Sequence, residues 1–202
     1  YIDGLVNEVT AIHASYPEYL SRNLKDAIFK GENPFKSDYF HPIDPRETRL
    51  DILEDKPSVI IATSGMLNGG PAVEYLRYLA PDPRNTLIFV GYQAEGTLGR
   101  MIKDGLKEWK TVVDNKVEIV NINLEVYSIE GFSGHSDQTE LVKYVREITP
   151  KPRTIILNHG EPTATTTLAI LLSKWLRKEP GYSNVSIYTP YILDSLNLTA
   201  RR

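Results

Sequence analysis

The chain has 202 residues, of which 41% are hydrophobic and 24% charged, and these values are ordinary for a globular protein. They exclude a disordered, collagen-like or coiled-coil chain, and no apolar run reaches the roughly 18 residues of a membrane span. With 23 Lys and Arg against 26 Asp and Glu, the formal charge of −3 provides no global basic field for nucleic acids. The absence of cysteine excludes disulfides and thiolate zinc sites, and we expect a cytoplasmic protein.

The N-terminal quarter of the sequence is typical of helices and loops. Asp3 is a candidate N-cap for a first helix, which carries an apolar stripe at helical spacing. A second helix is expected to open at Pro17 and to stop at Gly31. Residues 31–45 are rich in Pro and Gly and predict a loop, and residues 46–54 indicate a short helix.

From residue 58 the pattern becomes that of an α/β protein. Short β-branched or apolar runs predict strands at 58–63, 86–90, 154–158 and 185–188, and helices are expected at 72–79, 97–106, 138–148 and 162–177. Residues 109–130, with Asp114-Asn115 near the middle, predict a hairpin or meander. The alternation of strand, loop and helix predicts a mostly parallel sheet flanked by helices. In such sheets functional groups gather at the carboxyl ends of the strands.

Four histidines are candidate site residues, but none forms an HxH or HExxH metal motif with another. For His13 and His41 a structural role is the favoured interpretation. His159 stands at the carboxyl end of a predicted strand, where Gly160 allows a sharp turn into a helix. The electropositive helix N-terminus makes this a good place for a metal ligand or a phosphate contact. The alternative is a histidine that only caps the first helical turn.

His135 lies in the polar segment 132–137, before a helix that Asp137 is expected to cap. Glycine and serine in this segment leave backbone N–H groups free to face an anion, and the imidazole is suited to acid–base chemistry near neutral pH. A polar turn without catalytic function is the alternative interpretation.

Two further segments give weaker signals. Residues 91–100 are glycine-rich, but their spacing matches neither GxGxxG nor a Walker A loop, so a turn with close backbone packing is the better interpretation. Ser64 lacks the GxSxG elbow of a serine hydrolase. An unrelated nucleotide-binding domain and a hydrolase triad are therefore both disfavoured.

Taken in order, four motifs of the chain resemble β-CASP nucleases, RNA-processing members of the metallo-β-lactamase superfamily, and the archaeal cleavage and polyadenylation specificity factor homologues in particular. The motifs are 62–66 with Gly69-Gly70, 91–99, 132–137 and 158–161. The resemblance implies an N-terminally incomplete β-CASP domain over residues 1–130. It also implies that residues 131–202 are the C-terminal segment of a metallo-β-lactamase αββα fold.

The resemblance also implies roles for individual residues. His159 is similar to a ligand of one of two catalytic zinc ions in this family, and His135 to a residue that positions the scissile phosphate and protonates the leaving oxygen. Ser64, Gly65, Ser133 and Ser136 are implied to lie near the RNA backbone. The function expected from this resemblance is that of a zinc-dependent ribonuclease in mRNA 3′-end processing or transcription termination. Endonuclease and 5′-exonuclease modes share these motifs and both stay open.

The sequence departs from the family because the HxHxDH signature, the further His and Asp ligands and the acidic motif A are all missing. The family carries them upstream, so the chain resembles a C-terminal fragment whose partners are RNA and the missing N-terminal metallo-β-lactamase portion. A catalytic zinc ion needs at least three protein ligands, so we expect the isolated chain to be inactive. The resemblance suggests a homodimer as well. The alternative function is a non-catalytic RNA-binding or scaffolding subunit.

Overall fold

A computed structural model describes residues 1–43, 49–54, 57–132 and 134–198. The chain divides into two compact units, residues 1–133 and 134–202, and each is described here by itself. Within the described residues, no helix is both long and apolar enough to cross a membrane. Each unit has a hydrophobic core of its own.

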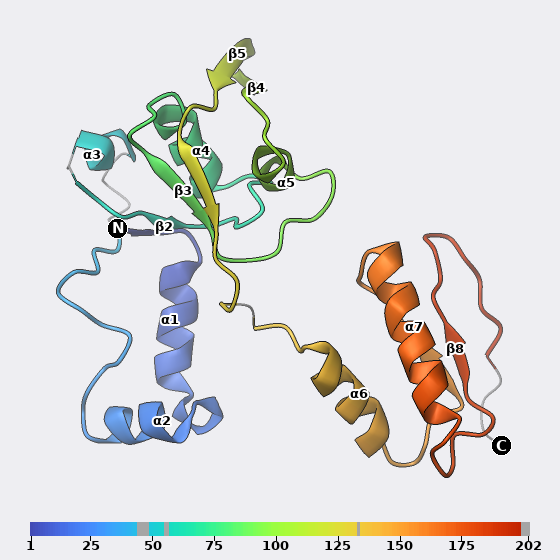
Figure 1. Ribbon diagram of the computed structural model, residues 1–202. Coiled ribbons are helices and arrows are strands. Elements are labelled where there is room, and N and C mark those ends of the chain that lie inside the picture. Colours follow the sequence, from blue (N-terminus) through green and yellow to red (C-terminus); the bar gives the residue numbers. More distant parts are fainter. Residues whose placement is uncertain (44–48, 55–56, 133, 199–202) are drawn as a thin grey trace. The chain divides into compact units, whose positions relative to one another are not determined.

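Unit 1 is a mixed α/β structure (Figure 1). Its elements in chain order are β1 (Ile2–Asp3), α1 (Val6–Ser15), the 3₁₀ helix η1 (Pro17–Tyr19), α2 (Arg22–Phe29), α3 (Arg49–Glu54), β2 (Ile61–Ala62), α4 (Pro71–Leu79), β3 (Thr86–Phe89), α5 (Leu98–Lys103), β4 (Glu108–Val113), β5 (Lys116–Asn121) and β6 (Glu125–Ser128). β1 pairs with β2 and β3 with β6 in parallel, and β4 pairs with β5 antiparallel.

Unit 2 is a smaller βαβ arrangement preceded by a helix. It contains α6 (Gln138–Glu147), β7 (Thr154–Ile156), α7 (Pro162–Leu176) and β8 (Ser186–Tyr188), and β7 pairs with β8 in parallel. The predicted α/β class with mostly parallel pairing is thus confirmed, and within the described residues the pairing is spread over four two-stranded sheets. The predicted assignment of residues 131–202 to a metallo-β-lactamase domain stays a prediction.

The core of unit 1 joins α4 and α5 to the β3–β6 pair. Leu76 and Ala80 belong to or follow α4, Phe89 ends β3 and Ile102 lies in α5, and each is at most 3% exposed. Complete burial of a Leu, Ile or Phe side chain contributes about 1.5–3 kcal/mol to folding. The chain before β6 is held to α4 because the Leu124 amide donates to the Ala80 carbonyl at 3.1 Å.

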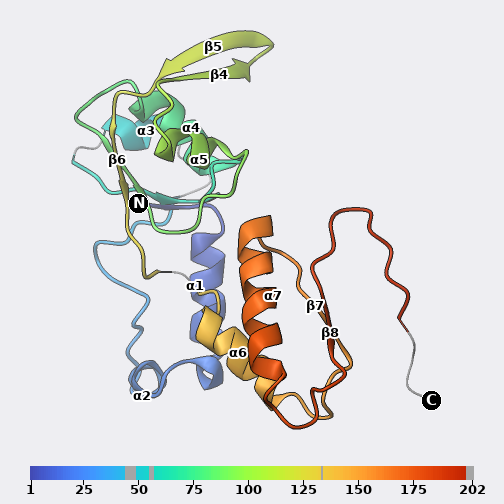
Figure 2. The ribbon, with the colours of Figure 1, turned by 45° about the vertical axis from the view of Figure 1, so that its right-hand side comes forward.

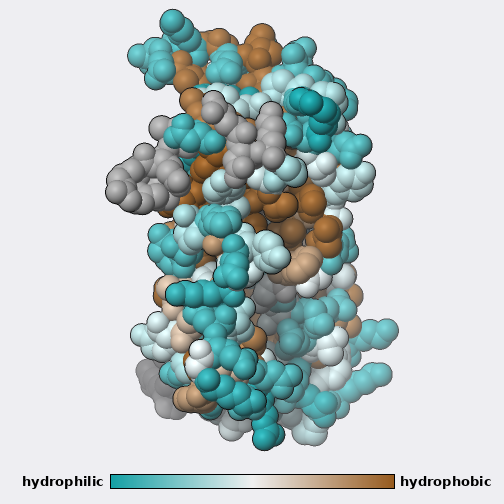
Figure 3. Space-filling model, turned by 90° about the vertical axis from the view of Figure 1, so that its left-hand side faces the viewer, coloured by the Kyte–Doolittle hydropathy of each residue, from teal (hydrophilic) through white to brown (hydrophobic). Residues whose placement is uncertain are grey.

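The hairpin β4–β5 confirms the expectation drawn from Asp114-Asn115. Both residues have positive φ, 48° and 61°, as a two-residue turn of the mirror-image type requires. The hairpin stands at the top of the view in Figure 2, and its surface shows both hydrophobic and hydrophilic side chains in Figure 3. Val112 and Val117 account for part of this apolar surface, since they are 67% and 72% exposed.

The last third of the predicted meander is different. β6 does not continue the hairpin but pairs in parallel with β3, with Leu87 opposite Val126. Local turn chemistry specifies the hairpin, whereas this pairing joins segments almost 40 residues apart. Of the two predicted alternatives, the hairpin is therefore confirmed and a meander that includes residues 125–128 is wrong.

Two other expectations need correction. The predicted buried strand at 58–63 shrinks to Ile61–Ala62, and Ile61 is 46% exposed because its two-residue pairing with β1 leaves one face open. The second helix does not begin at Pro17. Pro17 opens the short helix η1, and α2 begins separately after Ser21. The predicted helix at 46–54 is found from Arg49 onward, and residues 46–48 lie outside the described part of the chain.

Candidate functional site

The loop that follows β2 contains Ser64 and Gly65, two of the predicted substrate contacts. The Ser64 hydroxyl oxygen accepts a hydrogen bond from the Asn68 amide at 3.1 Å, and the Ser64 amide donates to the Gly69 carbonyl at 3.3 Å. The loop is thus closed on itself directly before α4. Gly65 is exposed, and no other atom lies within 4 Å of the position that a Cβ would take there. A ligand can therefore approach the Gly65 backbone closely.

Gln93 fixes this loop to the glycine-rich segment after β3. Its side-chain amide donates one hydrogen bond to the Gly65 carbonyl at 3.0 Å and another to the Gly91 carbonyl at 3.1 Å. The residue is only 3% exposed, so its amide is shielded from water. Gly99 also contacts the loop that follows β2, because its amide donates to the Met66 carbonyl at 3.1 Å. The close backbone packing expected for residues 91–100 is confirmed.

A charged cluster in unit 1 joins β1, α3 and α4. The Asp3 carboxylate accepts hydrogen bonds from Arg49 Nε at 2.7 Å and from the Tyr75 hydroxyl at 3.0 Å, and Arg49 Nη1 donates to Glu74 at 2.6 Å. Burial opposes ionisation of Asp3, but the hydrogen bonds from Arg49 and Tyr75 outweigh it and hold the pKa of this carboxyl below its ordinary value. Burial and the Asp3 carboxylate together raise the pKa of the Tyr75 hydroxyl.

This cluster corrects the role predicted for Asp3. The residue lies in β1 and is not the N-cap of α1, which is Leu5. Its side chain instead joins β1 to α3 through Arg49 and to α4 through Tyr75. A partner 46 residues away along the chain leaves no signal in the local pattern around Asp3.

His135 lies in an exposed loop directly before α6. The prediction that Asp137 caps this helix is confirmed by a reciprocal pair of bonds: Asp137 Oδ1 accepts from the Glu140 amide at 2.8 Å, and Glu140 Oε2 accepts from the Asp137 amide at 3.2 Å. His135 and Ser136 are both exposed just before this cap, at the electropositive end of α6. Ser133 lies outside the described residues.

His159 lies between the end of β7 and the start of α7, as the sequence predicts. It is exposed, and its φ is +65°, a left-handed conformation that a residue with a Cβ rarely adopts. Such backbone outliers concentrate at functional sites, where the surrounding structure maintains them. Gly160 and Glu161 follow, and the Glu161 carbonyl accepts from the Thr165 amide at 3.0 Å in the first turn of α7. The imidazole thus stands on a fixed strand-to-helix junction.

Among the residues that the structure describes, no three or more His, Cys, Asp or Glu side chains gather closely enough to share a metal ion. A protein zinc site needs at least three such ligands. The described part of this chain therefore does not fit a complete zinc site. His159 has the donor type and the exposure of a single ligand, but no group of side chains among the described residues completes its coordination.

Residues 1–102, about half of the chain, match the family model described as the Beta-Casp domain. The chain belongs to the β-CASP family. Residues 119–190 match a second model, described as the Zn-dependent metallo-hydrolase RNA specificity domain. The first match contains the 64–69 loop with Gln93, and the second contains His135 and His159. The β-CASP family expected from the motifs is thereby confirmed.

Three archaeal relatives in this β-CASP group are named transcription termination factor FttA. The chain is 52% identical to that of Pyrococcus abyssi over 172 residues, which are 84% of this chain and 26% of the relative. It is 47% identical to that of Methanocaldococcus jannaschii over 201 residues (98% and 31%) and 46% identical to that of Lokiarchaeum sp. over 180 residues (88% and 28%). The chain thus spans less than a third of the length of these curated relatives.

Sequence reasoning missed Gln93 as a site residue. A long amide between Gly91 and Gly96 was a usable signal, because a polar side chain in a glycine-rich turn has backbone carbonyls within reach. Neither Arg49 nor Tyr75 offered such a signal, since their partner Asp3 is distant along the chain.

Proposed function

We propose that this chain is part of a zinc-dependent ribonuclease that cleaves RNA phosphodiester bonds during transcription termination or RNA 3′-end formation in the cytoplasm. His159 carries the proposal. It is an exposed imidazole on a left-handed residue between β7 and α7, within a segment that matches a zinc-dependent metallo-hydrolase RNA specificity domain. In the complete protein His159 is one zinc ligand, and polypeptide outside this chain supplies the other ligands of a two-zinc centre.

The other predicted residues have distinct roles in this proposal. His135 is the general acid: its imidazolium gives a proton to the leaving ribose oxygen as the P–O bond breaks, while water supplies the new oxygen on phosphorus. Ser136 lies beside it at the N-terminus of α6, where amide groups attract a phosphate. Ser64 and Gly65, and Ser133 by resemblance, contact the RNA backbone. The isolated chain binds RNA but does not cleave it.

The test uses the complete protein, with His159→Ala, His135→Ala and the matched control His13→Ala, whose imidazole is exposed on α1 and stacks on Phe35. Bound zinc is measured by elemental analysis and cleavage with end-labelled RNA. We expect His159→Ala to lose zinc and cleavage. His135→Ala should keep its zinc and lose about 10²-fold or more in rate, and His13→Ala should keep both.

The outcome for zinc separates the two candidate functions. If His159→Ala retains zinc and cleaves RNA at the parental rate, the assignment of His159 is overturned. If the complete protein binds RNA but neither zinc nor His135 affects any cleavage, the chain belongs to a non-catalytic RNA-binding or scaffolding subunit. The observation that favours this second function is that the described residues contain no complete set of metal ligands.

A further inference from the structure

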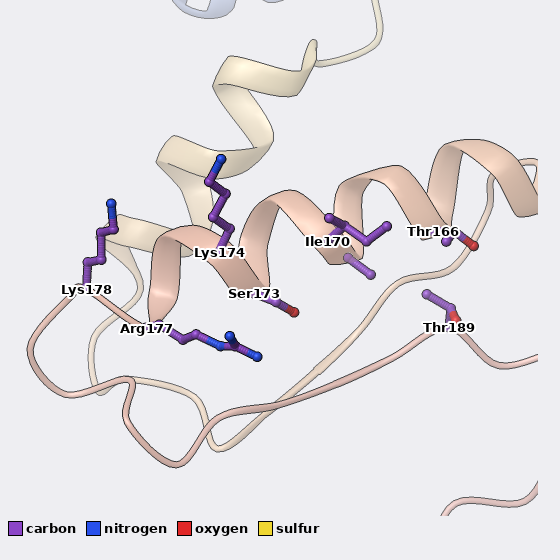
Figure 4. A pocket seen from close by; sticks show the side chains of 8 residues that line it. Thr166, Ile170, Ser173, Lys174, Arg177, Lys178 and Thr189 are labelled. Atoms are coloured by element: carbon purple, nitrogen blue, oxygen red, sulfur yellow. The ribbon is translucent and has the colours of Figure 1, made fainter.

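A groove runs along one face of α7, from Thr166 near the start of the helix to Arg177 at its C-terminal end. Its volume is about 570 Å³, and Thr166, Ile170, Ser173 and Arg177 line it from the helix, while Thr189 lines it from the segment after β8 (Figure 4). The spacing of the four helical residues places them on one side of α7. Pockets of this volume are typical of sites that bind small molecules or single residues of a polymer.

The groove combines three kinds of chemistry. Ser173, Thr166 and Thr189 bring hydroxyl groups, and Ile170 brings an apolar surface that is 64% exposed. The Arg177 guanidinium and the Ser173 hydroxyl lie on the side of the helix that faces the Thr189 segment (Figure 4). Hydroxyls, an apolar face and a guanidinium are the groups that contact the sugars, bases and phosphates of single-stranded nucleic acids.

Three cations lie toward the C-terminal end of the groove. Lys174, Arg177 and Lys178 line it, and no ion pair joins any of them to an acidic side chain among the described residues. In unit 1, by contrast, Arg84 pairs with Asp82 and Arg100 with Asp104.

Cations at a helix C-terminus are favourable by themselves, because they complement the helix dipole. The helix dipole does not explain why these cations lie beside a groove that is lined by hydroxyl and apolar side chains. Three unneutralised cations beside such a groove form a local field that favours a polyanion.

We propose that this groove binds the phosphodiester backbone of single-stranded RNA, with Arg177 as the main phosphate contact. The proposal rests on the proposed function, since it takes RNA as the ligand. From Pro162 to Arg177 the helix rises about 22 Å. The Arg177 end of the groove therefore lies away from the His159 loop, and the contact made there serves to retain the strand rather than to carry out chemistry.

The test measures binding by the complete protein, in a His135→Ala background that prevents cleavage. The probe is a fluorescein-labelled oligouridine, and its anisotropy is followed over a range of salt concentrations. The groove variant is Lys174→Gln, Arg177→Gln, Lys178→Gln. The matched control is Lys143→Gln, Arg146→Gln, Arg153→Gln, which removes three cations from the same unit outside the groove.

We expect the groove variant to bind about tenfold more weakly at low salt, and its log–log salt slope to become shallower by at least about 0.7, the contribution of one phosphate contact of a single strand. In the control variant, both the affinity for RNA and the salt slope should change by only a small fraction of these amounts. Equal losses in the two variants, or no loss in the groove variant, would overturn the proposal. So would equal competition by polyglutamate of matched charge, since the groove then accepts any polyanion.

A second measurement uses the parent protein and so does not depend on the folding of any variant. Photo-crosslinking of 4-thiouridine RNA to the parent protein should label the peptide that contains residues 166–178, and its absence from the labelled peptides contradicts the groove. These results are independent of the zinc experiment. If the complete protein holds no metal but still binds RNA in the groove, this inference stands and the proposed nuclease function is wrong. If cleavage depends on His159 but RNA does not bind in the groove, the nuclease function stands and this inference is wrong.

Discussion

The charged cluster around Asp3 makes a sharp prediction about the stability of unit 1. Asp3→Asn keeps the shape of the side chain but removes its charge. In the parent the carboxylate is only 10% exposed and accepts bonds from Arg49 and Tyr75. In the variant the amide oxygen remains an acceptor for Arg49 or Tyr75, but the ion pair with Arg49 is lost, and Arg49 keeps its ionic contact with Glu74. The change thus isolates the contribution of the Asp3 charge to the contact between β1, α3 and α4.

The expected loss in the free energy of unfolding is about 2 kcal/mol at neutral pH. A hydrogen bond to a charged group contributes about 1.5–3 kcal/mol, and removing one partner of a fully buried ion pair costs about 3–5 kcal/mol. The lower range applies because Arg49 is 33% exposed, so water solvates part of the guanidinium. Its remaining bond to Glu74 also prevents it from becoming an unpaired buried charge.

The loss should depend on pH with a definite sign. The pKa of Asp3 is lowered in the folded state from its ordinary value of 3.8. Its ionised form therefore stabilises the fold above pH 3.8, and this contribution is lost as the pH falls through the lower pKa of the folded state. Parent and variant should differ by the full amount at neutral pH and converge below 3.8.

The assay is urea unfolding followed by the fluorescence of Trp109, which packs against the core of unit 1. Parent and variant both carry Trp175→Phe, so that unit 2 contributes no tryptophan signal. Asp104→Asn is the matched control: it removes an exposed carboxylate paired with Arg100, and should cost at most about 0.5 kcal/mol. A loss no larger than that of the control, or one that stays constant below pH 3.8, would refute the reasoning.

Two further predictions concern single contacts. Gly99→Ala should destabilise unit 1 by about 1–3 kcal/mol in the same urea assay, because a Cβ would overlap the Gln93 side-chain oxygen and lie 3.0 Å from the Met66 carbonyl. Gly91→Ala, with open space around its Cβ position, should be nearly neutral. Asp137→Ala should cost about 1 kcal/mol through loss of the α6 cap, seen as a lower midpoint of unit 2 unfolding followed by Trp175 fluorescence in a Trp109→Phe background, and unchanged stability would contradict the capping role.

Local chemistry explains which parts of the fold could be predicted from the sequence. The cap of α6 depends on Asp137 and Glu140, three residues apart, and the hairpin turn on adjacent Asp114 and Asn115. Both signals lie within a few residues, so the sequence pattern is enough to find them. The exposed position of His159 at a strand-to-helix junction was predictable for the same reason.

Pairing across long separations explains what could not be predicted. β6 has the short sequence Glu-Val-Tyr-Ser, and nothing in these four residues selects β3 as its partner over the adjacent hairpin. Asp3 satisfies the local rule for an N-cap, yet an arginine 46 residues away gives its carboxylate a better partner. The candidate site shows the same limit: the sequence identified His159, but the contact of Gln93 with the Gly65 loop depends on tertiary packing.

The net charge of the whole chain is a poor guide to where it meets a polyanion. The value of −3 is the sum of two opposite parts: residues 1–133 carry 14 Lys and Arg against 20 Asp and Glu, and residues 134–202 carry nine against six. At physiological salt, charges more than about 8 Å apart are largely screened, so a phosphate senses the local side chains and not the total. Arg84 and Arg100 are each paired with a nearby carboxylate, whereas no ion pair joins Arg177 to an acidic side chain within the described residues. The unit with fewer acidic partners is therefore the one in which a basic groove can act on RNA.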